Sequence, residues 1–297
     1  MQTHDALGRA TFHHIDYRPG TRPTEREVRW LSFIERHGPQ SSIYLHELTR
    51  DTHRDRDTSL RQMQKLRAGG FLTCPRQQRA TENASFNPYI YDLTPKARDW
   101  LDDENLTEAT IRPTGHWVHQ YMVSCITASI DIGLQRKGLT YIPGHKILER
   151  AKTTLSVDLG RKKLTPDQLF GIDYGGLYRF FCLEADRGTE PKDTKAARKS
   201  YRSTIEDYAA FIGDKRYKQH YGLTAGMLLL YVFSSRTNER RFLETVSAML
   251  GNRSTYILTQ TIPGFHAYLK PPGMLNQLTQ QSWNRAKSEP FDIADAG

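Results

Sequence analysis

The chain has 297 residues, of which 37% are hydrophobic and 25% charged, a balance typical of a soluble protein that is long enough for two domains. The longest apolar run, residues 227–233, is far too short to span a bilayer, and the N-terminus lacks the apolar segment of a signal peptide, so we expect a cytoplasmic protein with no membrane partner. The net charge of +9 favours a polyanionic partner such as nucleic acid.

The N-terminal part of the chain predicts three helices behind an arm without periodicity, residues 1–22. Thr24 is followed three positions later by Glu27, a spacing close to that of a capping box, which marks the start of a helix. Apolar residues then recur at helical spacing in three stretches that turn residues separate. We expect the helices at residues 24–37, 43–48 and 57–68.

Two strands and a further helix follow, predicted at residues 71–74, 89–93 and 96–101 from their β-forming residues and from a Thr-Pro helix start. This order is typical of a winged helix-turn-helix domain, which we place at residues 23–102 with the loop 75–84 as its wing. Polar side chains on the third helix and in the wing are then candidate contacts to bases and phosphates of double-stranded DNA. These candidates are Ser59, Arg61, Gln62, Lys65, Arg76 and Arg79.

An acidic linker, residues 103–114, separates this domain from a second one that we expect at residues 115–270. The second domain opens with a predicted long helix over residues 115–137, which is also a candidate surface for a homodimer. His116 and His119 lie three positions apart in this helix, a spacing that can ligate a metal ion. No third ligand stands near them in the sequence, so we expect solvated or packing histidines.

Short strand or loop pieces are expected at residues 139–142 and 147–148. The densest basic stretch of the chain, residues 146–163, includes the second of these pieces and continues toward the predicted hairpin. Lys162 and Lys163 are therefore candidate phosphate contacts, and a solvated loop is the alternative interpretation.

A hairpin is predicted where Gly175-Gly176 separates two β-rich runs, because a tight turn of this kind needs positive φ at both central residues. If the two glycines form the loop, Asp167 lies opposite Glu184, and Asp186 projects from the same face as Glu184. Three carboxylates then share one patch of sheet. Like charges placed opposite each other are destabilising, so we expect a cation to offset them: a divalent metal, an arginine or a lysine.

Helices and buried strands alternate after the hairpin. This order predicts parallel neighbouring strands with right-handed crossovers, and therefore a three-layer α/β/α domain with a mixed sheet. Residues 271–297 are poor in apolar residues, and we expect a C-terminal tail whose last ten residues are loose. The predicted elements are helices at 193–211 and 239–250 and strands at 227–233 and 255–261.

The order of helix, acidic hairpin, helix and strand resembles the restriction-endonuclease-like PD-(D/E)XK fold, with Pro166-Asp167 at the start of the hairpin and Glu184-x-Asp186 at its end. This resemblance implies that Asp167 and Glu184 bind Mg²⁺ or Mn²⁺, which activates water for hydrolysis of DNA. The lysine of that family is replaced here by Asp186, and a neighbouring cation is the candidate substitute. The candidate catalytic residues are Asp167, Glu184, Asp186, Arg187 and Lys195.

A closer resemblance covers most of the chain. A winged helix followed by PDQLF, YRFFCLEADRGTEP and a basic helix resembles the replication-relaxation family of plasmids and integrative elements. The specific part is FCLEADRGTE, residues 181–190, which is similar to that family's E-x-D-R-G-T-E. The resemblance implies DNA binding in the replication or transfer of a plasmid or mobile element, with replication or transfer proteins as candidate partners.

Three functional hypotheses stay open. The missing lysine favours a DNA-binding protein with a degenerate nuclease-like domain, in which Arg187 neutralises the carboxylates by a salt bridge. The alternative is a metal-dependent DNA endonuclease or nickase of the PD-(D/E)XK type. A protein-interaction module that does not bind DNA is the third. The absence of GxxxxGK[ST] from the sequence excludes a P-loop nucleotide site.

Overall fold

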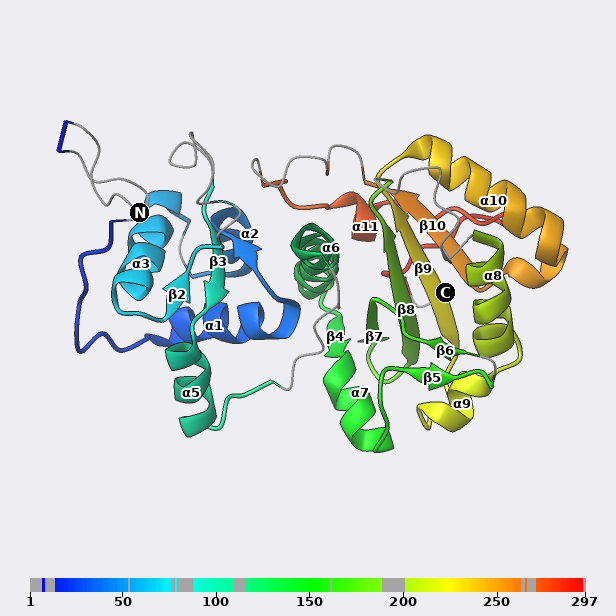
Figure 1. Ribbon diagram of the computed structural model, residues 1–297, viewed down its shortest axis with the longest axis horizontal. Helices are drawn as coiled ribbons and strands as arrows, with labels where there is room; N and C mark the ends of the chain where they lie inside the picture. The colour runs from blue at the N-terminus through cyan, green and yellow to red at the C-terminus, as the bar shows by residue number, and fades with distance from the viewer. Residues whose placement is uncertain are drawn as a thin grey trace. The chain divides into compact units, whose positions relative to one another are not determined.

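The computed structural model divides the chain into two compact units, which are described separately (Figure 1). The first consists of Met1–Arg112 with Ala267–Met274, and the second of Pro113–His266 with Leu275–Gly297. Among the described residues, no helix has the length and apolar character that crossing a membrane requires. The structure describes residues 7–8, 14–52, 54–75, 78, 88–108, 116–160, 162–188, 201–262, 265 and 271–295.

The first unit combines helices with a small antiparallel sheet of strand order β1-β3-β2, and the helices and the two strands predicted from the sequence are confirmed. The additional strand β1 was not predicted, because two residues are too few to show a periodicity. The helices are α1 (Glu25–His37), α2 (Ser42–Leu48), α3 (Arg56–Ala68) and α5 (Pro95–Asp103), and the strands are β1 (Gln40–Ser41), β2 (Leu72–Thr73) and β3 (Ile90–Leu93).

The start of α1 has the local chemistry that the sequence predicted. The backbone N–H of Thr24 donates to the carboxylate of Glu27 at 2.6 Å, which completes a capping box. The helix ends at Gly38, whose φ of 95° lies in the region that glycine adopts without strain.

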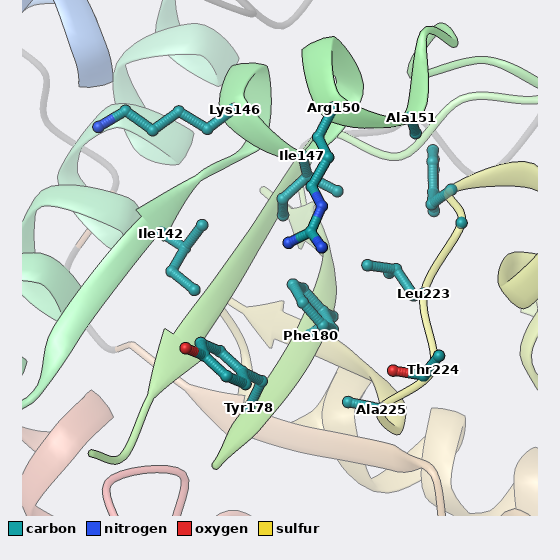
Figure 2. Close-up of a pocket in the computed structure, with 12 residues that line it drawn as sticks. Ile142, Lys146, Ile147, Arg150, Ala151, Tyr178, Phe180, Leu223, Thr224 and Ala225 are labelled. Carbon is teal, nitrogen blue, oxygen red and sulfur yellow. The ribbon is translucent and has the colours of Figure 1, made fainter. Parts of the chain in front are cut away.

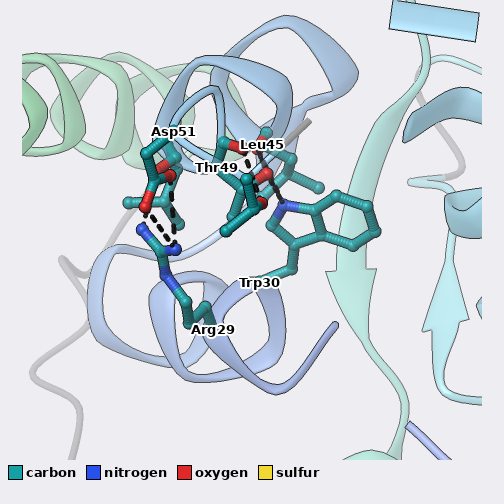
Figure 3. Close-up of polar contacts among 7 residues, drawn as sticks. Arg29, Trp30, Leu45, Thr49 and Asp51 are labelled. Atoms are coloured by element: carbon teal, nitrogen blue, oxygen red, sulfur yellow. Dashed lines mark hydrogen bonds and ion pairs between the residues drawn. The ribbon is translucent and has the colours of Figure 1, made fainter. Parts of the chain in front are cut away.

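Trp30 joins α1 to α2 in the interior of the first unit (Figure 3). Its side chain has no exposed surface, and its indole N–H donates to the carbonyl of Leu45 at 2.7 Å and to the hydroxyl of Thr49 at 3.0 Å. Beside it, Arg29 pairs with Asp51 at 3.0 Å. A large apolar ring with a satisfied polar group therefore fixes the position of α2.

The beginning of the predicted linker is attached to the first unit. Helix α5 extends to Asp103, and Glu108 forms an ion pair with Arg36 of α1. The backbone N–H of Glu108 donates to the carboxylate of Glu35 at 2.8 Å. The remaining linker residues, 109–114, lie outside the described residues.

The second unit contains a five-stranded sheet of strand order β10-β9-β8-β7-β4, with helices on both faces (Figure 1). β8 is parallel to β9 and β9 to β10, whereas β4, β7 and β8 run antiparallel, so the predicted mixed sheet is confirmed. α6 and α11 cover one face, and α8 and α10 cover the other. The strands are β4 (Thr140–Pro143), β7 (Gln168–Asp173), β8 (Tyr178–Asp186), β9 (Met227–Phe233) and β10 (Ile257–Thr261), and the helices are α6 (Trp117–Arg136), α8 (Tyr201–Tyr208), α10 (Arg236–Leu250) and α11 (Gln277–Gln280).

The turn between β7 and β8 has the predicted two-glycine loop. Gly175 and Gly176 have φ values of 85° and 102°, and the N–H of Tyr174 donates to the carbonyl of Leu177 at 2.8 Å. The side chain of Asp173 accepts both glycine N–H groups, at 2.9 and 2.7 Å. The sequence therefore determined this turn locally.

Three local predictions need correction or extension. Residues 147–148 belong to a helix and not to a strand, because their apolar side chains and Ala151 share one helical face behind Pro143. Of the helix predicted at 193–211, the structure describes α8 and a π-helical turn that continues it; residues 189–200 lie outside the described residues. The elements not predicted include α7 (Gly144–Ala151), the paired strands β5 (Val157–Asp158) and β6 (Lys163–Leu164), α9 (Arg216–His220) and the short helix α11.

The C-terminal segment at residues 275–295 is packed into the second unit, which contradicts the expectation that the last ten residues are loose. Trp283 and Ile293 have no exposed surface, and Trp283 forms a β-bridge with Phe291. The guanidinium groups of Arg179 and Arg285 lie 4.8 and 4.5 Å from the centre of the Phe291 ring. A few large side chains anchor this segment even though its overall apolar content is low.

Candidate nucleic-acid interface and carboxylate patch

Helix α3 presents basic side chains on its exposed face. Asp55 caps the helix by accepting two backbone N–H groups. Arg61, whose side chain is 72% exposed, donates to the hydroxyl of Thr58 and lies 3.9 Å from Asp55. Lys65 lies 3.6 Å from the buried carboxylate of Glu27. Exposed ion pairs of this kind are weak, so the guanidinium of Arg61 is free to exchange them for a phosphate or a base.

Ser59 lies on the inner face of α3, and its predicted contact with DNA is therefore wrong. The residue is fully buried, and its hydroxyl lies 3.1 Å from Nδ1 of His46 in α2. Helical spacing places it in line with Met63 and Leu66, which are also fully buried. Gln62 is partly buried. The hydroxyl of Ser59 thus connects two helices and does not reach the surface.

A groove of about 480 Å³ lies beside α3. Arg61, Lys65 and Arg67 line it from the helix. The N-terminal segment contributes His14, Ile15, Asp16 and Arg18. The backbone N–H of Arg18 donates to the carbonyl of Ala68 at 3.0 Å, which holds this segment against the end of the helix. The basic character of the groove suits a polyanion.

Gln78 lies in the predicted wing, residues 75–84. This residue is fully buried; its side chain accepts the N–H of Ile90 and donates to the carbonyl of Pro88, both at 2.8 Å. Arg76 and Arg79, the predicted wing contacts, lie outside the described residues.

The hairpin register that the two-glycine turn predicts is confirmed. Gln168 pairs with Leu183 at the end of the ladder, so the next step along the strand brings Asp167 beside Glu184. The backbone N–H of Asp167 donates to the carbonyl of Leu183 at 3.0 Å, and its carboxylate accepts the N–H of Ala185 at 2.8 Å. Asp167 therefore closes the open end of the hairpin with its own side chain.

Two of the carboxylates contact tyrosines of α8. Oε1 of the buried Glu184 accepts the hydroxyl of Tyr208 at 2.6 Å, and Oδ2 of Asp186 accepts the hydroxyl of Tyr201 at 2.7 Å. The tyrosines are seven residues apart, which places them on one face of the helix. Burial, and then the nearby charge of Glu184, raise the pKa of Tyr208 well above its ordinary value, so this hydroxyl stays a donor.

The third carboxylate, Asp167, pairs with a histidine from α6, the helix on the other face of the sheet. Nε2 of His119 lies 2.9 Å from Oδ1 of Asp167. Burial opposes protonation of His119, but the hydrogen bond and the charge of Asp167 outweigh it, and the pKa of His119 is raised. The ion pair with Asp167 extends our expectation of a packing histidine for His119, whereas His116 caps α6 by accepting the N–H of Val118.

His119 thus takes the place that we predicted for Arg187. Within the described residues Arg187 has no ion pair. Its positive charge opposes the rise in the pKa of His119 but does not cancel it. The same residues contain no group of three His, Cys, Asp or Glu side chains that is placed to hold a metal ion. The sequence singled out His119 only through its spacing from His116. Nothing in the sequence pointed to Asp167 as its partner, because the two stand 48 positions apart and only the packing of α6 brings them together.

Of the remaining predicted cations, the structure describes Lys162 and Lys163. Nζ of Lys162 pairs with Asp207 at 2.9 Å and donates to the hydroxyl of Ser203 at 2.6 Å. Lys163 is exposed in β6. Lys195 lies outside the described residues. The ammonium group of Lys162 therefore already contacts two residues of α8, and a phosphate would have to compete with them.

One comparison with known proteins gives a match. The family model described as replication-relaxation matches residues 31–227, from within α1 to the first residue of β9. No curated protein and no solved structure matches the chain. The matched range covers well over half of the sequence and includes both the basic helix α3 and the carboxylate patch. The chain therefore belongs to the replication-relaxation family.

Proposed function

We propose that this protein binds double-stranded DNA of a plasmid or mobile element, and that it acts in the replication or transfer of that element or in its regulation. The observation that carries the proposal is the exposed basic face of α3, with Arg61 at its centre. Family membership supports the biological setting. We interpret the first unit as a winged helix-turn-helix in which α3, the second helix of the α2–α3 pair, enters the major groove.

The packing beneath α3 supports this role. Trp30 fixes α2 on α1, and the hydrogen bond between His46 and Ser59 connects α2 to α3. A recognition helix reads bases well only if its side chains start from a rigid backbone. Ser59 therefore contributes by positioning α3 and not by touching DNA.

We expect Arg61→Ala to relax sequence preference and to weaken binding to a selected duplex by about 1 to 3 kcal/mol, since an arginine in a major groove pairs with guanine. The duplex is first chosen by in vitro selection from random sequences. Affinities for this duplex and a scrambled one are then measured by fluorescence anisotropy. Arg98→Ala is the matched control, because the side chain of Arg98 is 44% exposed on α5 and its substitution removes the same charge from the same unit. Equal losses in the two variants, or equal losses on both duplexes, would contradict the assignment of α3.

For the second unit we propose a nuclease-like fold whose carboxylates are held by the protein. The support is that Glu184 is hydrogen-bonded by Tyr208, and that Asp167 is engaged by His119 and by the N–H of Ala185. These contacts use part of the lone pairs with which the two carboxylates would otherwise bind a cation.

A metal-dependent endonuclease or nickase is the second candidate function, and the position of Asp167 beside Glu184 is the observation that favours it. We expect purified protein with Mn²⁺ to leave a supercoiled plasmid that carries the selected duplex intact. Nicking that Asp167→Asn and Glu184→Gln each abolish, with Asp214→Asn as the exposed control, would establish the nuclease instead.

A further inference from the structure

A second cavity, of about 480 Å³, lies in the second unit between α7, β8 and the segment 221–225 (Figure 2). Tyr178 and Phe180 rise from β8 on one side of it, two positions apart and therefore on the same face of the strand. Lys146 and Arg150, one helical turn apart on α7, supply the charge. The volume is within the range of pockets that hold small organic molecules.

The two aromatic rings are available to a ligand. The side chain of Tyr178 is 50% exposed, and Phe180 is only partly buried. Phe180 lies directly against Gly171 of β7, where an added Cβ would come within 2.9 Å of the ring. Gly171 thus lets the Phe180 ring sit close to the sheet, so its position is held before a ligand arrives.

The charge at this cavity is also available. Neither Lys146 nor Arg150 has an ion pair within the described residues, and no carboxylate lines the cavity. Figure 2 shows the guanidinium of Arg150 directed from α7 toward Phe180, while the side chain of Lys146 extends away from the other labelled residues. On the opposite side, Thr224 and Ala225 are small side chains that leave the space between the walls open.

We propose that this cavity binds an unpaired nucleotide of a DNA strand. The base stacks on Tyr178 and Phe180, Arg150 binds its phosphate, and Lys146 contacts a phosphate farther along the strand. Aromatic faces beside unpaired cations are the combination by which proteins hold single strands, because every base offers a ring face and every linkage a negative charge. This site is distinct from the duplex-binding face of α3 and extends the proposed function to single-stranded DNA.

The proposal is tested by fluorescence anisotropy with a labelled oligothymidine and the full chain. Tyr178→Ala is expected to weaken binding at least about fivefold, because stacking on the ring is lost. Leu177→Ala, which alters the neighbouring exposed hairpin residue outside the cavity, is expected to bind as the wild type does. An abasic strand with the same backbone removes the base but keeps the phosphates, so wild type and Tyr178→Ala should bind it alike.

The charge is tested with Arg150→Ala, which is expected to weaken binding of both strands and to reduce the dependence of affinity on salt. Thermal unfolding of the Tyr178 and Leu177 variants should match that of the wild type, which shows that a loss of affinity does not come from a loss of folding. Arg61→Ala should keep the Tyr178-dependent binding, so failure of duplex recognition at α3 is distinguishable from failure here. Equal affinity of wild type and Tyr178→Ala for oligothymidine would overturn the proposal. The proposal would also be overturned if thymidine monophosphate competed as effectively as the strand, because the cavity would then bind a free nucleotide. A Tyr178-dependent affinity for an acidic peptide, with none for DNA, would likewise contradict it.

Discussion

Replacing Trp30 by alanine is expected to lower the free energy of unfolding of the first unit by about 3 to 5 kcal/mol, the usual cost of emptying a buried tryptophan site. The ring has no exposed surface, and its removal leaves the carbonyl of Leu45 without the indole donor (Figure 3). Urea unfolding followed by circular dichroism measures the change. Because Trp30 supports α2, and α2 supports α3, duplex binding should be lost over the same range of urea concentration.

Trp30→Phe separates packing from hydrogen bonding. Phenylalanine fills most of the site but cannot donate to Leu45 or Thr49, while the hydroxyl of Thr49 still donates to the carbonyl of Leu45 at 3.1 Å. We therefore expect a smaller loss of about 0.5 to 1.5 kcal/mol, the usual net contribution of a hydrogen bond. If alanine and phenylalanine cost the same, packing is not the main contribution. If neither destabilises the unit, Trp30 does not hold α2 in place.

Asp167→Ala is expected to lower the free energy of unfolding of the second unit by about 3 kcal/mol, because removing one partner of a mostly buried ion pair leaves the other uncompensated. His119 loses its acceptor, and the N–H of Ala185 loses the carboxylate that closes the hairpin. Asp214→Ala is the matched control, since Asp214 is exposed and the substitution is the same. A destabilisation no larger than that of the control would contradict the structural role of Asp167.

The effect of Asp167→Ala should depend on pH in a defined direction. The pKa of His119 is raised in the folded protein, so the stability from this pair is fully present below the unfolded pKa of about 6.5 and is lost as pH rises through the folded pKa. The difference between wild type and Asp167→Ala is therefore largest in mildly acidic solution and shrinks toward alkaline pH. Urea unfolding of both proteins over a series of pH values checks this, and a constant difference would show that imidazolium is not the partner.

Local signals in the sequence determined much of this protein. The capping box at Thr24, the glycine pair at 175–176 and the apolar run at 227–233 each specify their element through neighbouring residues, and the structure contains all three. The hairpin register followed from the turn, because a two-residue loop leaves one pairing for every residue beyond it. The inner position of Ser59 was also readable, since it stands four and seven positions before Met63 and Leu66.

The tertiary structure decided what depends on residues far apart in the chain. His119 contacts Asp167 only because α6 packs on the sheet. Trp283 is buried only because the C-terminal segment that contains it packs on the second unit. The cavity of Tyr178 and Arg150 draws on a helix, a strand and a later loop, none of which contains a motif of its own. Sequence periodicity reports which face of an element is apolar, but it carries no information about which other element covers that face, because that choice is made by the packing of the whole unit.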